Sequence, residues 1–241
     1  MSIQWLERTQ LLIKDEGLAK LHEANVLVVG LGGVGSFAAE FLARAGVGNI
    51  TIVDGDTVDI TNINRQLPAL HSTVGKTKAE IVAERLYDIN PELKLNVKTE
   101  FLNPEQMAEV LDSEQFDYVM DCIDSVSPKL ALIKESRRRK IKIISAMGAG
   151  GKTNPSKILV RDISKTNNCY LAKQVRKRLK KESNIQKGVR CVFSTELQDE
   201  NSLRLTDGSN FKRSFYGTIS FIPAAFGLHA AAEVINYLIK K

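Results

Sequence analysis

A glycine-rich run near the N-terminus constrains the fold of this chain more than any other feature. It directly follows a short apolar stretch at residues 25–29 and precedes an alanine-rich helical pattern at residues 37–45. It fits the pattern GxGxxG through Gly30, Gly32, Gly33 and Gly35. Such glycines let the backbone approach phosphate oxygens, and the helix N-terminus adds N–H donors. Together with Asp54, which can accept hydrogen bonds from ribose hydroxyls, the run predicts a bound nucleotide.

Strand and helix patterns alternate after this turn. We expect strands at residues 25–29, 50–53, 94–99, 118–120 and 141–145, and helices at 37–45, 77–90, 104–111 and 128–139. This alternation predicts an α/β fold with a doubly wound, Rossmann-like, mostly parallel sheet.

Three segments organise the chain. We predict an N-terminal helical segment at residues 1–24, a nucleotide-binding core at 25–152 and a smaller C-terminal lobe at 153–241. The lobe should contain strands at 158–163 and 189–193, a basic helix at 169–181, a flexible polar loop at 196–213 and a closing helix at 222–239.

Composition points to an ordinary globular protein in a reducing compartment. The chain has 241 residues and a net charge of +6, so a polyanionic partner is plausible. The three cysteines form no CxxC pair and the charged N-terminus does not resemble a signal peptide, so we expect a cytoplasmic protein. Residues 214–232 carry no formal charge, but two glycines, a proline and a histidine interrupt them. We therefore expect a strand and a buried helix there rather than a membrane span.

The residues of the long polar connection after the second strand indicate whether the nucleotide is ATP or NAD. Arg65 and Lys78 would each be a solvated surface charge if taken alone. Together at these offsets they favour ATP, because adenylyl transfer needs cations at the phosphates whereas hydride transfer does not. Asp124 follows a predicted strand and can hold Mg²⁺ through one carboxylate and several waters. Asp121, nearer the strand, is more simply explained as a cap or brace of the loop.

These motifs resemble, in order and spacing, the ubiquitin-activating-enzyme-like adenylating enzymes. The matching patterns are GxGGxG at 30–35, DxD at 54–56, NxNRQ at 62–66, GxxK at 75–78 and CxD at 122–124. The resemblance implies that ATP activates a carboxylate as an acyl adenylate and that pyrophosphate leaves. The resemblance also implies that Asp54 binds the ribose, that Arg65 and Lys78 bind the phosphates, and that Asp124 binds the magnesium ion. The nucleotide pocket would be completed by Asp56, Asn62 and Gln66.

The same resemblance implies a homodimer. Family members commonly place an arginine of an N-terminal helix at the partner's nucleotide, and Arg8 stands at the matching distance before the first strand. The alternative is an ordinary arginine on a helix surface. An arginine supplied to a phosphoryl-transfer site can raise the rate by about 10³ to 10⁵.

Within that family the whole length is similar to the tRNA threonylcarbamoyladenosine dehydratases. The similar stretches are residues 62–66, 123–125, 128–129, 148–151 and 191–196. The implied reaction is ATP-dependent activation of the threonyl carboxylate of the modified adenosine beside the anticodon, followed by ring closure with loss of water. The resemblance leaves open a monovalent cation, a sulfur-relay protein partner and contact of the apolar C-terminal segment with a membrane surface.

Other functions remain as alternatives. An adenylyltransferase for a ubiquitin-like sulfur-carrier protein would use the same core, but such enzymes usually carry two CxxC zinc pairs. A nucleotide-sensing tRNA-binding module would not need Arg65, Lys78 and Asp124 together. An NAD-dependent reductase would need a hydride-site constellation that the sequence lacks.

Two basic runs fit a tRNA substrate. One lies in the predicted helix at 169–181 and the other at 137–140. Basic side chains that neutralise phosphates gain affinity through counterion release, although such a run can also be only a solvated face. The candidate tRNA contacts are Arg176, Lys177, Arg178, Lys180 and Lys181.

The cysteines bear on mechanism. A nucleophile already tethered to the activated acyl group needs no thiol carrier, because proximity supplies a large effective concentration. We therefore expect Cys191 to be structural or to line a pocket, and Cys122 to be a small core residue.

Overall fold

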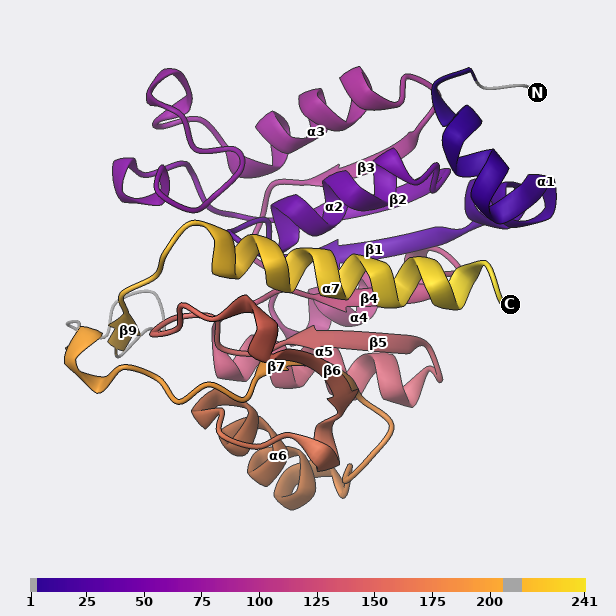
Figure 1. Ribbon diagram of the computed structural model, residues 1–241. Coiled ribbons are helices and arrows are strands. Elements are labelled where there is room, and N and C mark those ends of the chain that lie inside the picture. Colours follow the sequence, from indigo (N-terminus) through magenta and orange to yellow (C-terminus); the bar gives the residue numbers. More distant parts are fainter. Residues whose placement is uncertain (1–3, 206–213) are drawn as a thin grey trace.

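The computed structural model describes residues 4–205 and 214–241. Its centre is a seven-stranded sheet in the order β3-β2-β1-β4-β5-β7-β6 (Figure 1). The strands are β1 (Asn25–Val29), β2 (Asn49–Val53), β3 (Lys94–Lys98), β4 (Tyr118–Asp121), β5 (Lys142–Ala146), β6 (Ile158–Asp162) and β7 (Arg190–Ser194). Pairing is parallel from β3 through to β7, and β6 joins β7 antiparallel. The predicted mostly parallel sheet is confirmed.

Helices cover both faces of the sheet, as the doubly wound prediction requires. One apolar core lies between the sheet and α2 (Gly35–Arg44), α3 (Lys78–Ile89) and α7 (Phe221–Leu238). A second lies between the other face and α4 (Pro104–Ser113), α5 (Val126–Arg138) and α6 (Tyr170–Ser183). Strand residues alternate between them: Val26 and Val28 face the first core, and Leu27 and Val29 the second.

The strand order reverses between β1 and β4. The chain proceeds outward from β1 to β2 and β3, then returns to β4 and continues outward through β5. In open α/β sheets ligands bind at the carboxyl ends of the strands where this reversal leaves a crevice. The glycine-rich turn follows β1 and Asp124 follows β4, so the topology brings these two motifs to that point.

The C-terminal third adds to the same sheet. Strands β6 and β7 extend it beyond β5, and α7 crosses the sheet to pack beside α2 (Figure 1). The approach to α2 is close, because a Cβ on Gly227 would lie 2.5 Å from the Val34 carbonyl oxygen. A short ribbon of β8 (Leu203–Leu205) and β9 (Ser214–Tyr216) precedes α7. The loop predicted to be flexible falls partly on residues 206–213, which lie outside the described residues.

Helix α7 contains the apolar segment that raised the question of a membrane span. Among the described residues it is the one helix that is long and apolar enough, by length and composition, to cross a membrane. Of that window, 44% is buried within the protein. The expected strand and helix are both present, as β9 and α7, but the helix is only partly buried.

Candidate active site

The glycine-rich turn lies tightly between the ends of β1 and β4. Gly30 has a φ of +91°, and a Cβ there would lie 2.9 Å from the Cys122 carbonyl oxygen. A Cβ on Gly35 would lie 1.7 Å from the Gly30 carbonyl oxygen. Both positions therefore require glycine. The turn leads directly into α2, so its backbone N–H groups lie at a helix N-terminus, as a phosphate-binding turn needs.

Asp54 fastens this turn to the segment after β2. Its carboxylate accepts hydrogen bonds from the backbone N–H of Leu31 at 2.5 Å and of Asp56 at 2.7 Å. Burial raises the pKa of Asp54, although both N–H donors and the nearby Lys78 favour the ionised form. Each carboxylate oxygen can accept a further bond, so the predicted contact with a ribose hydroxyl stays a prediction compatible with this geometry.

Lys78 is buried at the first position of α3 and points to the same segment. Its ammonium group lies 2.8 Å from the carboxylate of Asp56, which is itself half-exposed. The helix is held there because the Lys78 N–H donates to the Asp56 carbonyl oxygen. An ammonium group has three donors, so this ion pair leaves capacity for phosphate oxygens.

Arg65 and Asp124 come together although 59 positions separate them in the sequence. Burial lowers the pKa of the half-buried Arg65 guanidinium, and the neighbouring Asp124 carboxylate opposes that effect. The guanidinium donates to the Thr61 carbonyl oxygen and to the Asn64 side-chain oxygen, both at 2.8 Å. The predicted phosphate ligand and the predicted magnesium ligand therefore face the same part of the site.

Asn62 and Gln66 shape the wall around Arg65. Asn62 is buried and closes a capping box with Asp59. The side-chain amide nitrogen of Gln66 lies 3.8 Å from where a Cβ on Gly32 would stand. The Gln66 side-chain oxygen is buried and accepts no hydrogen bond from any described residue. A buried acceptor without a donor suits a ligand that donates a hydrogen bond there.

A buried ion pair supports the loop that carries Asp124. Asp121 and Lys129 are fully buried, and their charged atoms lie 2.8 Å apart. The Lys129 ammonium also bonds to the Ser145 hydroxyl at 3.2 Å and to the Ala146 carbonyl oxygen at 2.9 Å. The pair ties the ends of β4 and β5 to α5. Asp121 thus braces the loop, as expected, whereas its partner Lys129 was marked in the sequence only by its place in the stretch 128–129 that carries the resemblance.

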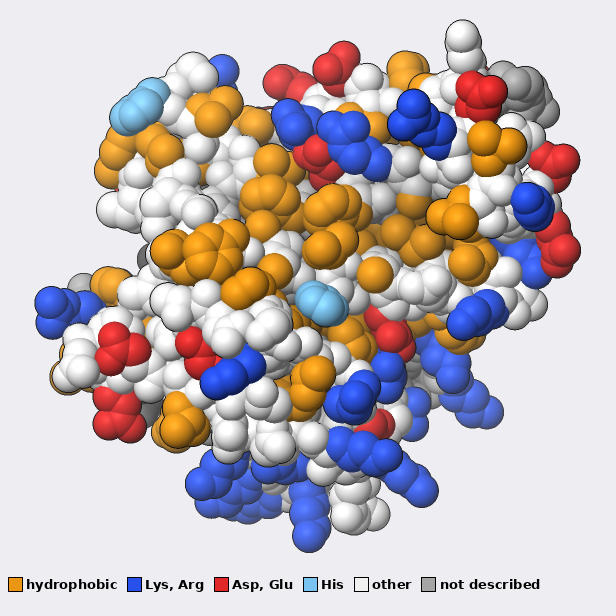
Figure 2. Space-filling model, viewed as in Figure 1, with side chains coloured by type: hydrophobic (Ala, Val, Ile, Leu, Met, Phe, Trp, Pro, Cys, Tyr) orange, Lys and Arg blue, Asp and Glu red, His pale blue; other side chains and the backbone are white. Residues whose placement is uncertain are grey.

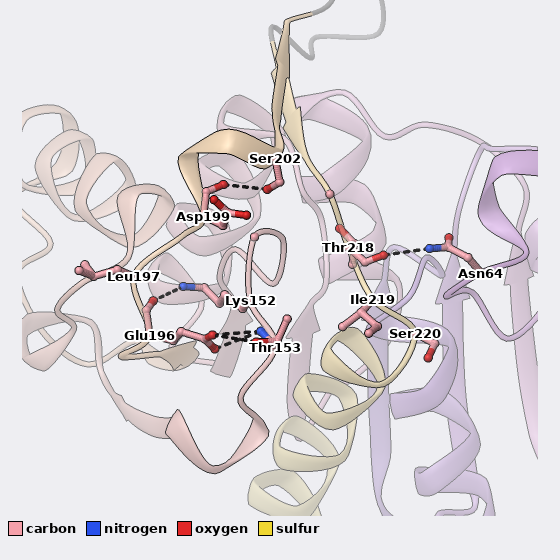
Figure 3. A pocket seen from close by; sticks show the side chains of 12 residues that line it. Asn64, Lys152, Thr153, Glu196, Leu197, Asp199, Ser202, Thr218, Ile219 and Ser220 are labelled. Carbon is pink, nitrogen blue, oxygen red and sulfur yellow. Dashed lines mark hydrogen bonds between the residues drawn. The ribbon is translucent and has the colours of Figure 1, made fainter.

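A hollow of about 640 Å³ opens beside Arg65. Figure 3 shows Lys152, Thr153, Glu196 and Asp199 on one side, facing Thr218, Ile219 and Ser220 on the other. Asn64 joins the hollow to the nucleotide side: its amide nitrogen donates to the Thr218 carbonyl oxygen at 2.9 Å, and its oxygen accepts from Arg65.

Lys152 and Glu196 hold one wall of the hollow together. The buried Lys152 ammonium donates to the Glu196 carbonyl oxygen at 2.5 Å, and burial lowers the pKa of Lys152. The Glu196 carboxylate accepts from the backbone N–H groups of Thr153 and Asn154. Neither residue was singled out as functional from the sequence. The sequence did hold one indication: Lys152 directly follows the stretch 148–151, and Glu196 ends the stretch 191–196, and both stretches carry the resemblance.

Arg8 does not reach this site within its own chain. It is exposed on α1 (Glu7–Glu23), which lies at the opposite, amino edge of the sheet. There the Leu21 carbonyl oxygen accepts from the Gly48 N–H in the loop that leads into β2 (Figure 1). The predicted contact of Arg8 with a nucleotide would therefore have to form across an interface between two chains.

The five candidate tRNA contacts lie on α6 but differ in exposure. Lys177, Lys180 and Lys181 are exposed. Figure 2 shows basic side chains gathered in its lower part, where Figure 1 labels α6 in the same view. Arg176 donates to the Thr166 carbonyl oxygen at 3.0 Å, and Arg178 pairs with Glu182 at 2.6 Å. Arg176 therefore ties α6 to the segment before it, while Arg178 pairs within α6 and also donates to the Ser127 hydroxyl of α5 at 3.4 Å.

The three cysteines offer no exposed thiol. Cys191 and Cys169 are buried, and Cys122 is partly buried. Burial raises the pKa of Cys122 to about 12 and the pKa of Cys191 well above its ordinary value. Because the thiolate is the nucleophile, the environments of Cys122 and Cys191 do not favour acyl transfer to sulfur. The structural role expected for Cys191 agrees with its burial in the core beneath β7.

Comparison with known proteins places these features in one family. A model of the ThiF family matches residues 6–241. A tRNA threonylcarbamoyladenosine dehydratase of Bacillus subtilis is 42% identical over 240 residues, covering 97% of this chain and 94% of that protein. The Escherichia coli protein of the same name is 40% identical over 260 residues, covering 100% and 97%. The solved structure of the E. coli enzyme in complex with ATP superposes with a TM-score of 0.89 at 39% identity, covering 100% of this chain and 97% of that one.

Proposed function

This chain belongs to the ThiF family, and from that premise we propose that it is an ATP-dependent tRNA threonylcarbamoyladenosine dehydratase. One observation carries the proposal: full-length relatives of this name match a chain whose Arg65, Lys78 and Asp124 gather around the glycine-rich turn. The expected ATP site is supported by the similarity to a structure solved with ATP.

The reaction has two steps in this proposal. A carboxylate oxygen of the threonyl group attacks the α-phosphorus of ATP, and the bond to the β-phosphate oxygen breaks, so that pyrophosphate leaves. A nucleophilic atom of the same modified nucleoside then attacks the acyl carbon, and AMP leaves with the carboxylate oxygen while a proton is released. The nucleoside has then lost one molecule of water. The second step needs no thiol carrier, because the nucleophile is tethered to the acyl group.

The residues at the point where the strand order reverses would each bind a different part of the nucleotide. The backbone N–H groups of the glycine-rich turn would hold phosphate oxygens, and Asp54 the ribose. Arg65 and Lys78 would neutralise the charge that develops on the phosphates, which is the largest contribution an adenylating site can make. The unpaired oxygen of Gln66 would accept a hydrogen bond from the nucleotide.

Magnesium fits this arrangement through Asp124. Within the described residues no group of three or more His, Cys, Asp or Glu side chains gathers, so the phosphates would complete the coordination. One carboxylate with waters and phosphate oxygens is a usual set of ligands for Mg²⁺. The ion would supply further positive charge at the phosphates.

We further propose that two copies form the working enzyme. Figure 2 shows hydrophobic side chains along and above α7, where Phe221 and Leu228 are about half exposed. A partner on this face would bury them, and it would give Arg8 a route to the other chain's nucleotide. A membrane surface is the other occupant that this face could contact. Light scattering distinguishes the two, because a dimer in solution doubles the mass without lipid.

The carrier-protein alternative predicts a thiol acceptor, and none of the three cysteines fits that role. The test of the proposed function is direct. The purified protein is incubated with ATP, Mg²⁺ and tRNA that carries threonylcarbamoyladenosine, and the digested RNA is analysed by mass spectrometry. We expect a nucleoside lighter by one water, formed only with ATP. An unchanged nucleoside, with AMP formed only on addition of a carrier protein, would favour the alternative.

A further inference from the structure

We propose that the hollow beside Arg65 is the subsite for the threonylcarbamoyl group and its adenine base. The inference rests on the proposed function and adds to it the place where the nucleoside binds. The proposed phosphate and ribose contacts all lie in the segments after β1, β2 and β4. The hollow is formed mainly by other segments, those after β5 and β7 and the one before α7, and Asn64, from the segment after β2, lines it on the nucleotide side.

The hollow lies next to the place where the reacting phosphate is proposed to bind. Asn64 stands between the two spaces, with its oxygen bonded to the Arg65 guanidinium and its nitrogen to the Thr218 carbonyl oxygen. On the same side, a Cβ on Gly33 would lie 3.0 Å from the Arg65 carbonyl oxygen and 2.9 Å from Pro223. A carboxylate projecting from the hollow past Asn64 would therefore meet the phosphates that Arg65 is proposed to bind.

Its lining suits a ureido-linked amino acid. Thr153, Thr218 and Ser220 contribute hydroxyl groups to the lining. The Thr153 hydroxyl donates to the Glu196 carboxylate and the Thr218 hydroxyl to the Tyr216 carbonyl oxygen, so both hydroxyl oxygens can accept from N–H and hydroxyl groups of the ligand. Lys152 is the one cation among the described lining residues, on the same wall as the Glu196 and Asp199 carboxylates, and it would be the counter-charge for the ligand's carboxylate.

Its size and opening fit a nucleoside that is presented by tRNA. Pockets for small ligands measure about 300 to 1,000 Å³, and this hollow of about 640 Å³ falls within that range. The start of α6 lies near it, because Cys169, directly before α6, is close enough to Lys152 in the wall to affect the pKa of Lys152. The basic side chains further along α6 could then hold the RNA backbone while one base enters the hollow.

The experiment fills the hollow and leaves the nucleotide side intact. Thr153→Trp places a large side chain in it, and Leu197→Trp does the same from the exposed rim, where it cannot disturb the core. Gln115→Trp, at the exposed amino edge of β4, is the matched control. We expect both hollow variants to bind ATP within twofold of wild type and to raise the KM for modified tRNA at least tenfold. The control should change neither value.

A second measurement examines binding without chemistry. The nucleoside N6-threonylcarbamoyladenosine is added to the protein saturated with a non-hydrolysable ATP analogue, and binding is detected by saturation-transfer NMR. We expect a signal with wild type and the control, and its loss in both hollow variants; adenosine should give none.

The outcomes separate the two proposals. If wild type dehydrates the tRNA but both hollow variants keep its KM and its nucleoside signal, the subsite is wrong and the proposed function stands. If wild type gives no dehydrated nucleoside, the proposed function fails and takes the assignment with it.

Discussion

Of the three lysines that are buried among the described residues, Lys78, Lys129 and Lys152, the last two are held in different ways. The ammonium of Lys129 meets a fully buried carboxylate, a hydroxyl and a carbonyl oxygen. The ammonium of Lys152 makes one hydrogen bond within the described part of the chain, with the Glu196 carbonyl oxygen, and it stands in the wall of the hollow.

This difference indicates that Lys129 has a structural role, whereas the Lys152 ammonium can still bind a ligand. A buried charge is costly unless it is paired, so the region around Lys129 is fixed by its own partners. Burial lowers the pKa of Lys152, which shows that its surroundings do not fully stabilise the positive charge. An anionic ligand in the hollow would supply what is missing there. Burial of a lysine therefore does not by itself decide between structure and function; the partner set does.

The largest expected effect tests whether positive charge at the phosphates comes from Arg65, as proposed, and not from Lys129 or Lys152. Arg65→Ala should lower ATP–pyrophosphate exchange by about 10² to 10³, the usual cost of removing a preorganised group that stabilises developing charge. The exposed Arg161 on β6 provides the control, Arg161→Ala. Exchange within a few fold of wild type would show that Arg65 is not at the phosphates.

The next effect is on stability. Lys129→Met leaves Asp121 buried without a counter-charge and should lower the free energy of unfolding by about 3 to 5 kcal/mol. Adding Asp121→Asn should recover much of that loss, because the remaining amide is neutral. Urea denaturation measures both. If Lys152→Met lowers the free energy of unfolding as much as Lys129→Met does, the two lysines have the same structural role and the proposed difference between them is wrong.

The sequence predicted the strands of the main sheet and the helices from α2 to α7 within one or two residues, because each carried a local signal, but it missed β8, which lies in the predicted loop at 196–213. An apolar β-rich run ended in glycines at β1, and a proline opened α4 at Pro104. The motifs at 30–35 and 54–56 were equally local. The mostly parallel sheet followed from the alternation of strands and helices, whereas the order of its strands was not predicted.

The hollow had no such signal. It is assembled from Asn64, Lys152, Glu196 and Thr218, which lie far apart in the sequence and meet through the antiparallel pairing of β6 with β7 and the return of α7. Nothing local to Lys152 marks it as buried, because its burial comes from the segment after β7. For the same reason the bond from Arg176 to Thr166 was not foreseen in a helix that looks uniformly basic.

A smaller, selective effect is expected at the hollow. Lys152→Met should raise the KM for modified tRNA about tenfold while the affinity for ATP holds. Because the pKa of Lys152 is lowered by burial, its ammonium loses its proton at a lower pH than usual. The wild-type KM should therefore rise at alkaline pH, and the KM of the variant should not follow that rise. Parallel profiles in the two proteins would remove Lys152 from the site and make it equivalent to Lys129.

The basic face of α6 should contribute affinity that depends on salt. Replacing Lys177, Lys180 and Lys181 by glutamate should weaken tRNA binding and reduce the slope of log Kd against log salt by about 0.9 for each duplex phosphate that these lysines neutralise. The control replaces three exposed lysines away from α6, Lys94, Lys142 and Lys240. Equal slopes in both triple variants would mean that α6 contributes only general positive charge.

The smallest effect is expected at Cys191. Its thiol is buried, points to the Val189 carbonyl oxygen at 3.7 Å and has a pKa raised well above the ordinary value. Cys191→Ser keeps a donor of similar size at this position, so ATP–pyrophosphate exchange and dehydration of the tRNA should both stay within about twofold of wild type, a difference worth less than about 0.5 kcal/mol. Complete loss of exchange, with the fold intact by circular dichroism, would place the thiol in the chemistry. The sheet beneath the hollow would then be part of the reacting site instead of its support.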